Sequence, residues 1–577
     1  MAAATVIIGS ICAASSSLLR VVGYFFLRWA PLSIFPPAIY TAFAVYFASF
    51  FYLFDAQIKT ENTAEATGKE APATKTEAET NTEKSHEGAP PVDGKSDTTV
   101  SRVPWRTFFL GLPEIDRPFW TLLAIFINLS VLCCTLDLVY TSFKSMPLLG
   151  LEFSRIGYVS STSATFVVRD PFSEPVLLRY REIVSGAEEV TFDFADDYDW
   201  AGWSTVVVAE KLGEESDYTT RVVVDGLKPA TRYSYAAPFL NSSFVTAPEE
   251  GAGRFSFLST SCIKARVPYN PLDNPLSING FKVHDFLRNE VDFLLFLGDF
   301  TYADVPKLMG TDEESFRRHY RHVYWYLRAL GWTTLPTVHV FDDHEIINDY
   351  DPRHQDLYAP AISSAWKAYQ DAGNPAAMHD NTTYYTFERQ GIPFFLMDTR
   401  TYRSLESAPD GPAKTMLGMR QLEDLRTWLE AHRAAPFKFV VSSVPFTKNW
   451  IGVDKFDTWG GYQHERRRIL EWMFAAGGGV VVLSGDRHEA AAIRFPAPDG
   501  DSANDVYEFS ASPFSQFYIP IRTHWQVDDE DVTLMYKPRG NSKVGKVDVE
   551  MRADGSTQMD YTLYIDGEAE WSYTLLR

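Results

Sequence analysis

The chain has 577 residues, which exceeds one ordinary domain and predicts two or three folded parts. Its hydrophobic share of 45% supplies enough apolar side chains for packed cores and excludes a chain that is disordered throughout. The formal net charge of −22 favours a soluble surface and argues against nucleic acid as a partner, because phosphate backbones are bound by basic surfaces.

Three apolar runs precede the rest of the chain. The second and third, residues 33–54 and 119–140, come close to the roughly 20 residues needed to cross a bilayer and contain no Lys or Arg. The first, residues 4–27, is interrupted by Arg20 and lacks the basic start of a signal peptide, so it is either a further span or part of a hairpin with the second. We expect a membrane region with one or two spans at 1–55 and another span within 104–148.

A polar linker separates these runs. Residues 56–103 are rich in Thr, Glu, Lys, Ala and Pro and have almost no aromatic or branched apolar side chains, which predicts a disordered acidic linker. The bias of basic residues places this linker in the cytosol and the carboxyl-terminal part in a lumen or outside the cell, although Arg20 and Arg28 act in the opposite direction. Glycosylation sequons at Asn241 and Asn381 fit the same orientation.

Short alternating strands dominate residues 149–250. Runs such as SATFVVRD and YTTRVVVDGL, with turn residues between them, predict a small all-β sandwich. The passage LKPATRYSY, residues 227–235, is similar to the turn and strand of fibronectin-type sandwiches in which an aromatic side chain locks a corner. We expect its role to be structural.

Strands and helices alternate from residue 251 to residue 577, which predicts a layered α/β domain. The expected strands cover residues 254–262, 291–299, 337–345, 394–400, 438–445 and 480–488. The expected helices cover residues 313–329, 418–433 and 463–475. Alternating strands are expected to return from residue 543 to the end.

Polar groups stand where nearly every central strand ends. They are Cys262, Asp299 with Tyr302, the run Asp342 to Glu345 that includes Asp343 and His344, Asp398 with Arg400, and Asp486 with His488. One Gly-Asp pair after a strand is only a common turn. Several buried carboxylates at one sheet edge would each be costly to desolvate, and cations remove that cost. The pattern therefore predicts a metal site.

The ligand types suggest two unlike metals. A Tyr302 phenolate near neutral pH needs a hard, strongly polarising cation such as Fe³⁺, and a Cys262 thiolate also suits iron. Asp343 and Asp486 offer oxygen ligands only, which suit Ca²⁺, Mg²⁺ or Mn²⁺. We therefore expect a mixed pair, with Mg²⁺ or Mn²⁺ possible in place of Ca²⁺.

The ordered motifs SC (261–262), GDFTYAD (298–304), FDDHE (341–345), MDTRTYR (397–403) and SGDRHEA (484–490) resemble the PhoD-like alkaline phosphatases of the calcineurin-like metallophosphoesterase superfamily. The resemblance covers residues 254–577 and implies a β-sandwich core flanked by helices. It departs at Arg487, where the family more often has a small residue.

The resemblance implies a role for each matching residue. Fe³⁺ would be held by Cys262, Asp299, Tyr302 and His488, and Ca²⁺ by Asp299 as the bridge, Asp343 and Asp486. His344 would protonate the leaving oxygen. Arg400 would either brace the site through Asp398 or face the phosphate.

Three functions follow from this pattern. The first is metal-dependent hydrolysis of phosphate esters by a membrane-anchored enzyme. The second is a phosphodiesterase that acts on lipid headgroups or other diesters. The third, from another class, is a membrane-tethered binding module whose hydrolase-like part is inactive, and the presence of all the expected ligands argues against it.

Overall fold

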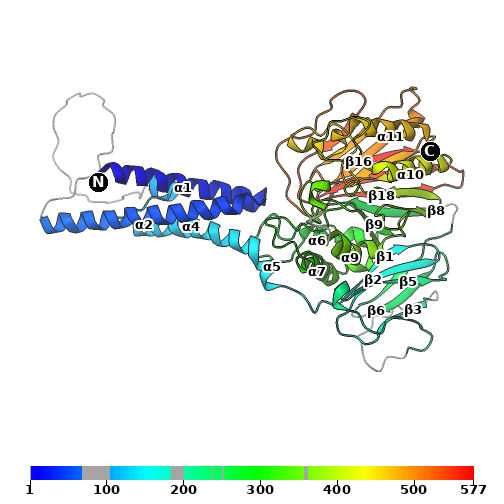
Figure 1. Ribbon diagram of the computed structural model, residues 1–577, viewed down its shortest axis with the longest axis horizontal. Coiled ribbons are helices and arrows are strands. Elements are labelled where there is room, and N and C mark those ends of the chain that lie inside the picture. Colours follow the sequence, from blue (N-terminus) through cyan, green and yellow to red (C-terminus); the bar gives the residue numbers. More distant parts are fainter. Residues whose placement is uncertain (1, 68–103, 184–199, 238–239, 250–252, 356–360) are drawn as a thin grey trace, which may run out of the picture. The chain divides into compact units, whose positions relative to one another are not determined.

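The computed structural model describes residues 2–67, 104–183, 200–237, 240–249, 253–355 and 361–577 (Figure 1). The chain divides into two compact units. The first holds Met1–Phe26 and Ile34–Leu136, and the second holds Leu27–Ser33 and Asp137–Arg577. Most of the predicted linker, residues 68–103, lies outside the described residues.

The first unit is helical. It contains α1 (Ala2–Arg28), α2 (Phe35–Thr67), the short α3 (Trp105–Leu110) and α4 (Pro118–Leu136). Three stretches are long and apolar enough to cross a membrane, namely Ala3–Arg28, Phe35–Thr63 and Pro118–Ser145. The first run therefore qualifies by length and composition despite Arg20. Helix α2 continues beyond residue 54 into the segment expected to be disordered, because residues 55–67 lack Gly and Pro and favour a helix.

Arg20 has polar partners inside this unit. Its Nε donates to Asn128 Oδ1 at 2.7 Å, and its guanidinium also donates to the carbonyl oxygens of Phe108 and Phe109. Asn128 Nδ2 donates to Ser16 Oγ at 3.0 Å. A charged residue in an apolar helix is tolerated when neighbouring groups satisfy it, which explains why Arg20 does not interrupt α1.

The second unit begins with a small sandwich. Strands β1 (Phe153–Val159), β2 (Ser163–Arg169) and β5 (Thr219–Asp225) form one sheet. Strands β4 (Ser204–Ala209), β3 (Val176–Glu182), β6 (Arg232–Ala237) and β7 (Leu240–Val245) form the other. The Tyr233 hydroxyl accepts the Lys228 backbone N–H at 2.9 Å, which fixes the expected aromatic corner. The fibronectin-like character stays a prediction.

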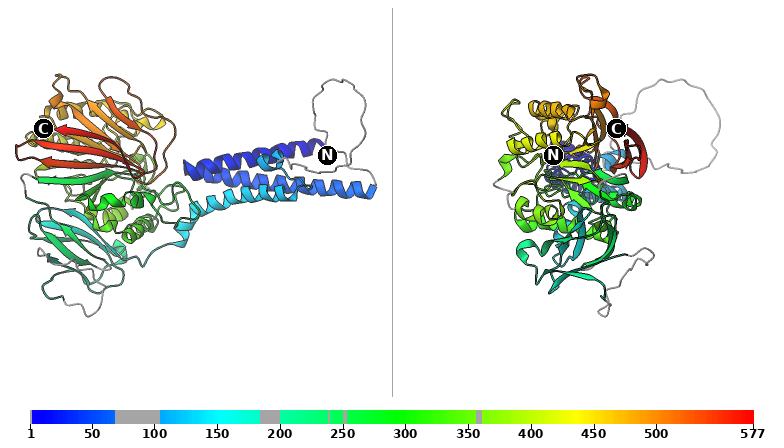
Figure 2. Two further views of the ribbon diagram at one scale, coloured as in Figure 1. Left: turned by 180° about the vertical axis from the view of Figure 1, so that it is seen from behind. Right: turned by 90° about the vertical axis from the view of Figure 1, so that its right-hand side faces the viewer.

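Two larger sheets face each other in the α/β region. The six-stranded sheet has the order β10-β9-β8-β18-β19-β20. Its strands are β8 (Gly253–Thr260), β9 (Phe293–Phe296), β10 (Thr337–His339), β18 (Lys543–Met551), β19 (Thr557–Ile565) and β20 (Glu568–Leu576). The carboxyl-terminal strands, drawn in red, lie beside β8, far away in sequence (Figure 2).

The seven-stranded sheet has the order β11-β12-β13-β14-β16-β15-β17. Its strands are β11 (Tyr385–Arg389), β12 (Ile392–Leu396), β13 (Lys438–Val441), β14 (Val480–Ser484), β15 (Ala490–Phe495), β16 (Val506–Ala511) and β17 (Val532–Lys537). A core that includes Phe257, Leu295, Phe394, Phe439 and Val481 fills the space between the sheets. The predicted layered β-sandwich is therefore confirmed.

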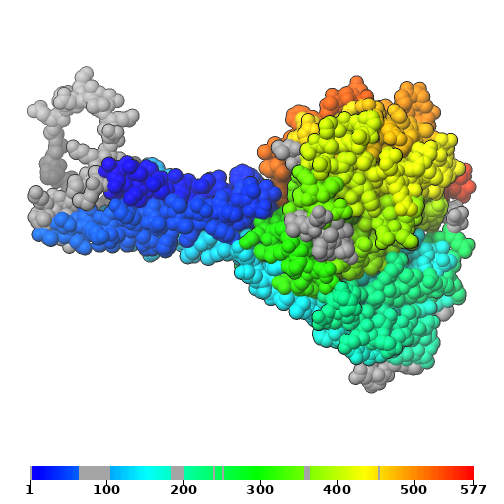
Figure 3. Space-filling model, in the orientation of Figure 1, coloured from blue at the N-terminus to red at the C-terminus, as the bar shows by residue number. Residues whose placement is uncertain are grey.

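Helices cover the outer faces. Helix α7 (Glu313–Leu330) packs on the six-stranded sheet through a core that contains Phe316, Tyr320 and Leu327. Helices α10 (Gly418–Ala431) and α11 (Gln463–Ala475) pack on the seven-stranded sheet. The sandwich, coloured cyan to green, and the α/β region form one continuous surface (Figure 3).

The predicted strands are real but shorter than expected. Each central strand stops before the polar residues that were counted as its end, so these residues stand in turns. Four of them adopt a positive φ, namely Cys262 (64°), Asp299 (59°), Asp486 (71°) and His488 (55°). Such conformations are uncommon for residues other than glycine and concentrate at functional sites.

Candidate metal centre

Parallel strand pairing brings the predicted residues to one edge. Strands β8, β9 and β10 run parallel in one sheet, and β12, β13 and β14 run parallel in the other. Their carboxyl ends therefore meet at the same end of the sandwich, where open α/β sheets assemble their sites. Asp299 follows β9, Asp342 and Asp343 follow β10, and Asp486 follows β14.

Close backbone packing sets the turn before Asp299. Gly298 has a φ of +100°, and a Cβ added to it would lie 2.3 Å from Asp342 Cβ. No side chain fits there, so the β9 and β10 turns can approach each other only with glycine at this position. This approach places Asp299 and Asp342 in the same acidic cluster.

One half of the centre joins four predicted ligands. The Tyr302 hydroxyl donates to Asp299 Oδ2 at 2.6 Å and lies 3.1 Å from His488 Nε2. The Cys262 thiol donates to the same Asp299 oxygen at 3.3 Å. Burial, together with Asp299, raises the pKa of both Cys262 and Tyr302 well above their usual values. Both groups need a cation before they can ionise at neutral pH.

The other half is a cluster of carboxylates. Oxygen atoms of Asp299, Asp342 and Asp486 lie within 4.8 Å of one another, and the same limit holds for ligand atoms of Asp299, Asp343 and His344. Asp299 thus belongs to both groups, as a bridging residue would. Asp342, which is not among the ligands that the resemblance implies, lies with Asp299 and Asp486 in the first group.

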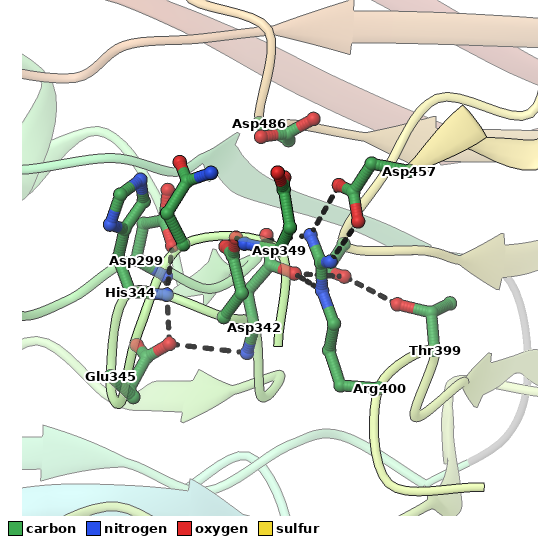
Figure 4. A network of polar contacts seen from close by, with 12 residues as sticks. Asp299, Asp342, His344, Glu345, Asp349, Thr399, Arg400, Asp457 and Asp486 are labelled. Carbon is green, nitrogen blue, oxygen red and sulfur yellow. Dashed lines mark hydrogen bonds and ion pairs between the residues drawn. The ribbon is translucent and has the colours of Figure 1, made fainter. Parts of the chain in front are cut away.

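Figure 4 shows these carboxylates between His344 on one side and Arg400 with Asp457 on the other. Arg400 Nε donates to Asp342 at 2.5 Å, and its Nη2 lies 3.4 Å from Asp343 Oδ1. Nη1 and Nη2 both bond the Asp457 carboxylate, the longer bond measuring 2.9 Å. The Arg400 guanidinium does not pair with Asp398, whose side chain accepts backbone N–H groups and the Thr401 hydroxyl instead.

The His344 ring contacts Asp304 and Tyr302. Its Nδ1 lies 2.8 Å from Asp304 Oδ1, and its ring stacks on Tyr302 with 4.1 Å between centroids. Burial lowers the pKa of His344, but the carboxylates of Asp304, Asp343 and Asp299 outweigh burial and raise it well above its ordinary value. These carboxylates therefore favour the protonated form of His344.

Burial also raises the pKa of Asp299 and Asp486 well above the usual range, and neighbouring carboxylates add to the effect. The buried Oδ2 atoms of Asp342 and Asp486 have no hydrogen-bond partner in the part of the chain that the structure describes. Unpaired buried carboxylate oxygens are the donors that hard cations take. The residues present therefore fit a metal centre.

Residues 276–561 match the family model of PhoD-like phosphatases. The chain belongs to the PhoD-like phosphatase family. It is therefore a phosphoric ester hydrolase by family, and its matched stretch contains every predicted ligand except Cys262, which precedes it.

A solved structure of PhoD has the same fold, with a TM-score of 0.54 and 18% sequence identity over 74% of this chain and 88% of that chain. A β-glucuronidase from Faecalibacterium prausnitzii also aligns, with 10% identity over 58% of this chain and 52% of that chain, but its TM-score of 0.22 is too low to support an argument. A search of curated proteins found no match.

Three residues of this PhoD-like centre escaped prediction. Asp457 lies in a 3-10 turn region, with no strand before it to mark it. Asp349 lies in the loop after β10, and its oxygen falls within 4.8 Å of oxygens of Asp343 and Asp457. Asp304 belongs to the GDFTYAD motif but is not among the predicted site residues. Only its partner His344 shows what it supports.

The Glu345 carboxylate links the two turns that carry the acidic residues of this centre. It accepts the backbone N–H groups of Asp299 at 3.2 Å, Phe300 at 2.8 Å and Asp342 at 3.1 Å. One side chain thus fixes both turns that carry the acidic ligands. Burial raises the pKa of Glu345 to about 8, with Asp342 adding to the effect.

Proposed function

We propose that the protein is a membrane-anchored hydrolase of phosphate esters, of the alkaline phosphatase type, with a dinuclear centre. Fe³⁺ is assigned to Cys262, Asp299, Tyr302 and His488. Ca²⁺, or Mg²⁺ or Mn²⁺ in its place, is assigned to Asp299, Asp343 and Asp486. The observation that carries the proposal is the sharing of Asp299 between the Tyr302 and Cys262 contacts and the carboxylate clusters.

When bound, such metals lower the pKa of a coordinated water and neutralise charge on the phosphoryl oxygens. The chain's own residues do the rest. Asp304 holds His344 at Nδ1, so Nε2 is the nitrogen from which a proton passes to the leaving oxygen. Arg400 holds Asp342 and Asp343 in place, which makes it a positioning residue.

The choice between monoesters and diesters is open to direct test. The full chain is assayed with nitrophenyl phosphate and with its bis-ester. Faster cleavage of the monoester is expected for a phosphatase, and faster cleavage of the bis-ester would make the protein a phosphodiesterase. Cleavage of neither would support the binding-module alternative and contradict the proposed function.

Iron has a spectroscopic test. A phenolate bound to Fe³⁺ gives a visible charge-transfer band, and Tyr302→Phe removes the phenolate while keeping the ring. We expect the purified protein to show the band and the variant to lose it. A colourless, iron-free and fully active enzyme would refute the metal assignment.

We further propose that the catalytic part faces a lumen or the cell exterior. The Asn381 sequon is exposed, which makes it accessible to glycosylation. If α4 spans the membrane, the linker and the catalytic part lie on opposite sides. A glycosidase should increase the mobility of the native protein on a gel, and an unchanged mobility in both the protein and Asn381→Gln would contradict this orientation.

A further inference from the structure

A hollow adjoins the metal centre within the second unit. Two groups of apolar side chains line it, and they are called its apolar walls below. The first is Leu138, Val139 and Phe143, and the second is Leu276, Val305 and Met309. The hollow is therefore suited to hydrocarbon rather than to a fully hydrated ligand.

The first wall belongs to a stretch that could cross a membrane. Leu138, Val139 and Phe143 belong to Pro118–Ser145, the third stretch that is long and apolar enough to cross a membrane. The end of a spanning helix lies at the bilayer surface. A hydrocarbon chain in that bilayer could therefore reach this hollow without crossing water.

The polar part of the hollow is basic. Lys264 Nζ donates to the Tyr302 carbonyl at 3.2 Å, and exposed Lys307 lies 3.4 Å from the Tyr140 hydroxyl. Buried Arg266 is neutralised by Asp137, whose carboxylate lies 2.5 Å from its NH2. The two lysines are therefore left to attract an anionic group.

Tyr302 belongs to both the hollow and the metal centre. It lines the hollow, and its hydroxyl is 2.6 Å from Asp299 Oδ2. An anionic headgroup beside Lys264 would thus lie beside Tyr302, while its hydrocarbon chain extends along Val139 and Met309 towards the end of the apolar stretch.

We propose that this hollow binds the substrate and that the substrate is a membrane phospholipid whose phosphate is esterified to an acyl-bearing glycerol. The apolar walls take the first part of the acyl chain, and Lys264 and Lys307 attract the phosphate. This inference rests on the proposed hydrolase function and narrows its substrate class.

The test uses the full chain in phosphatidylcholine vesicles that contain dioleoyl phosphatidate, with phosphatidylglycerol as the diester probe. Glycerol 3-phosphate and glycerophosphoglycerol are the matched water-soluble esters. Release of phosphate or of glycerol is measured. We expect the lipid esters to be cleaved with a higher kcat/KM than their soluble counterparts, because the apolar walls add binding that the soluble esters cannot use.

Two variants probe the two parts of the hollow. Lys307→Glu reverses the charge at its polar part, and Met309→Asp puts a carboxylate on its apolar wall. Each should lower the ratio of lipid to soluble kcat/KM by about tenfold. The matched controls, Lys367→Glu and Met419→Asp, change exposed residues on other elements and should leave that ratio unchanged.

The outcomes separate the two proposals. Cleavage of soluble esters without cleavage of the lipids would overturn this inference and leave the hydrolase function standing. An unchanged ratio in both Lys307→Glu and Met309→Asp would also overturn it. Failure to cleave any of the esters would contradict the hydrolase function, and this inference with it.

Discussion

Two clusters of buried carboxylates in the second unit show opposite electrostatics. Asp217, 4% exposed, lies between Arg169 at 2.8 Å and Arg321 at 2.6 Å, and it also accepts the Tyr369 hydroxyl. Burial raises the pKa of Asp217, but the two arginines outweigh burial and lower it. Glu314 also bonds Arg321, so two carboxylates balance two arginines here without any added ion.

The metal centre has too few cations of its own. Six carboxylates, those of Asp299, Asp342, Asp343, Glu345, Asp457 and Asp486, share Arg400, Arg403, Arg487 and the His344 ring, and both Arg400 and Arg403 bond Asp457. Burial raises the pKa of Asp457, but these two arginines outweigh burial and lower it, while the pKa values of Asp299 and Asp486 are raised. Buried carboxylates that arginines compensate serve stability, whereas those left uncompensated are the place for metal ions.

The largest effect is expected where the uncompensated cluster loses its shared ligand. Asp299→Asn should lower activity by about 10³-fold or more, because the carboxylate that would serve both proposed metals becomes a neutral amide. The assay is kcat/KM with nitrophenyl phosphate. Asp217→Asn is the matched control, and an equal loss in both variants would contradict the comparison.

The compensated cluster should respond in stability instead. Asp217→Ala leaves Arg169 and Arg321 buried without their carboxylate and should lower the free energy of unfolding by about 3–5 kcal/mol. Denaturant unfolding measures this loss. Metal content per folded chain should stay that of the unmodified protein, and loss of metal would show that the two clusters are not independent.

The effect expected of a change at Arg400 is smaller than that at Asp299. Arg400→Lys keeps the positive charge but loses the planar fork that bonds Asp342 and Asp457 together. We expect metal affinity to fall by about 10–100-fold, the usual effect of removing a group that orients metal ligands. Competition with a chelator measures it, and wild-type affinity in Arg400→Lys would show that charge alone matters.

The smallest expected effect is a pH dependence of stability caused by the buried His284 ring, which pairs with neither an arginine nor a proposed metal. Both ring nitrogens of His284 are buried without a hydrogen-bond partner in the described parts of the chain. Burial lowers its pKa from 6.5 to about 4. The unfolded state thus binds more protons than the folded state between those values, so stability is full above pH 6.5 and falls as the pH drops towards 4.

His284→Phe should remove this loss of stability, on the order of 1 kcal/mol, because a phenyl ring binds no proton. The phenyl ring should fit the site, since the His284 ring already packs against Phe514 with 5.5 Å between centroids. Unfolding of both proteins is compared at pH 7 and pH 5. An identical decline in stability in the variant would assign the pH dependence to other groups.

Much of this architecture follows from short-range sequence patterns. The layered α/β core was predictable because buried strands such as FLLF and VVVLS alternate with helical segments. Strands β11, β15, β16 and β17 were not predicted, since their pairing is set by contacts between residues far apart in the sequence. The exact strand ends depend on positive-φ turns that composition does not reveal.

Site residues that directly follow a strand could be predicted from the sequence, whereas those in loops could not. Asp299 and Asp486 stand directly after apolar runs, whereas Asp457 reaches Arg400 from a 3-10 turn region distant from any such run. Arg466 shows the same limit. It lies in the expected helix at residues 463–475, but it is buried and pairs with Asp531. Long-range ion pairs of this kind leave no local signal.

Metal analysis of the purified full chain tests the central claim most directly. The account predicts a pair of metal ions per chain, one of them iron, that remain in Asp217→Asn and are lost together with activity in Asp299→Asn. A protein that hydrolyses phosphate esters while holding no metal, or an Asp299→Asn variant that keeps both ions, would contradict it.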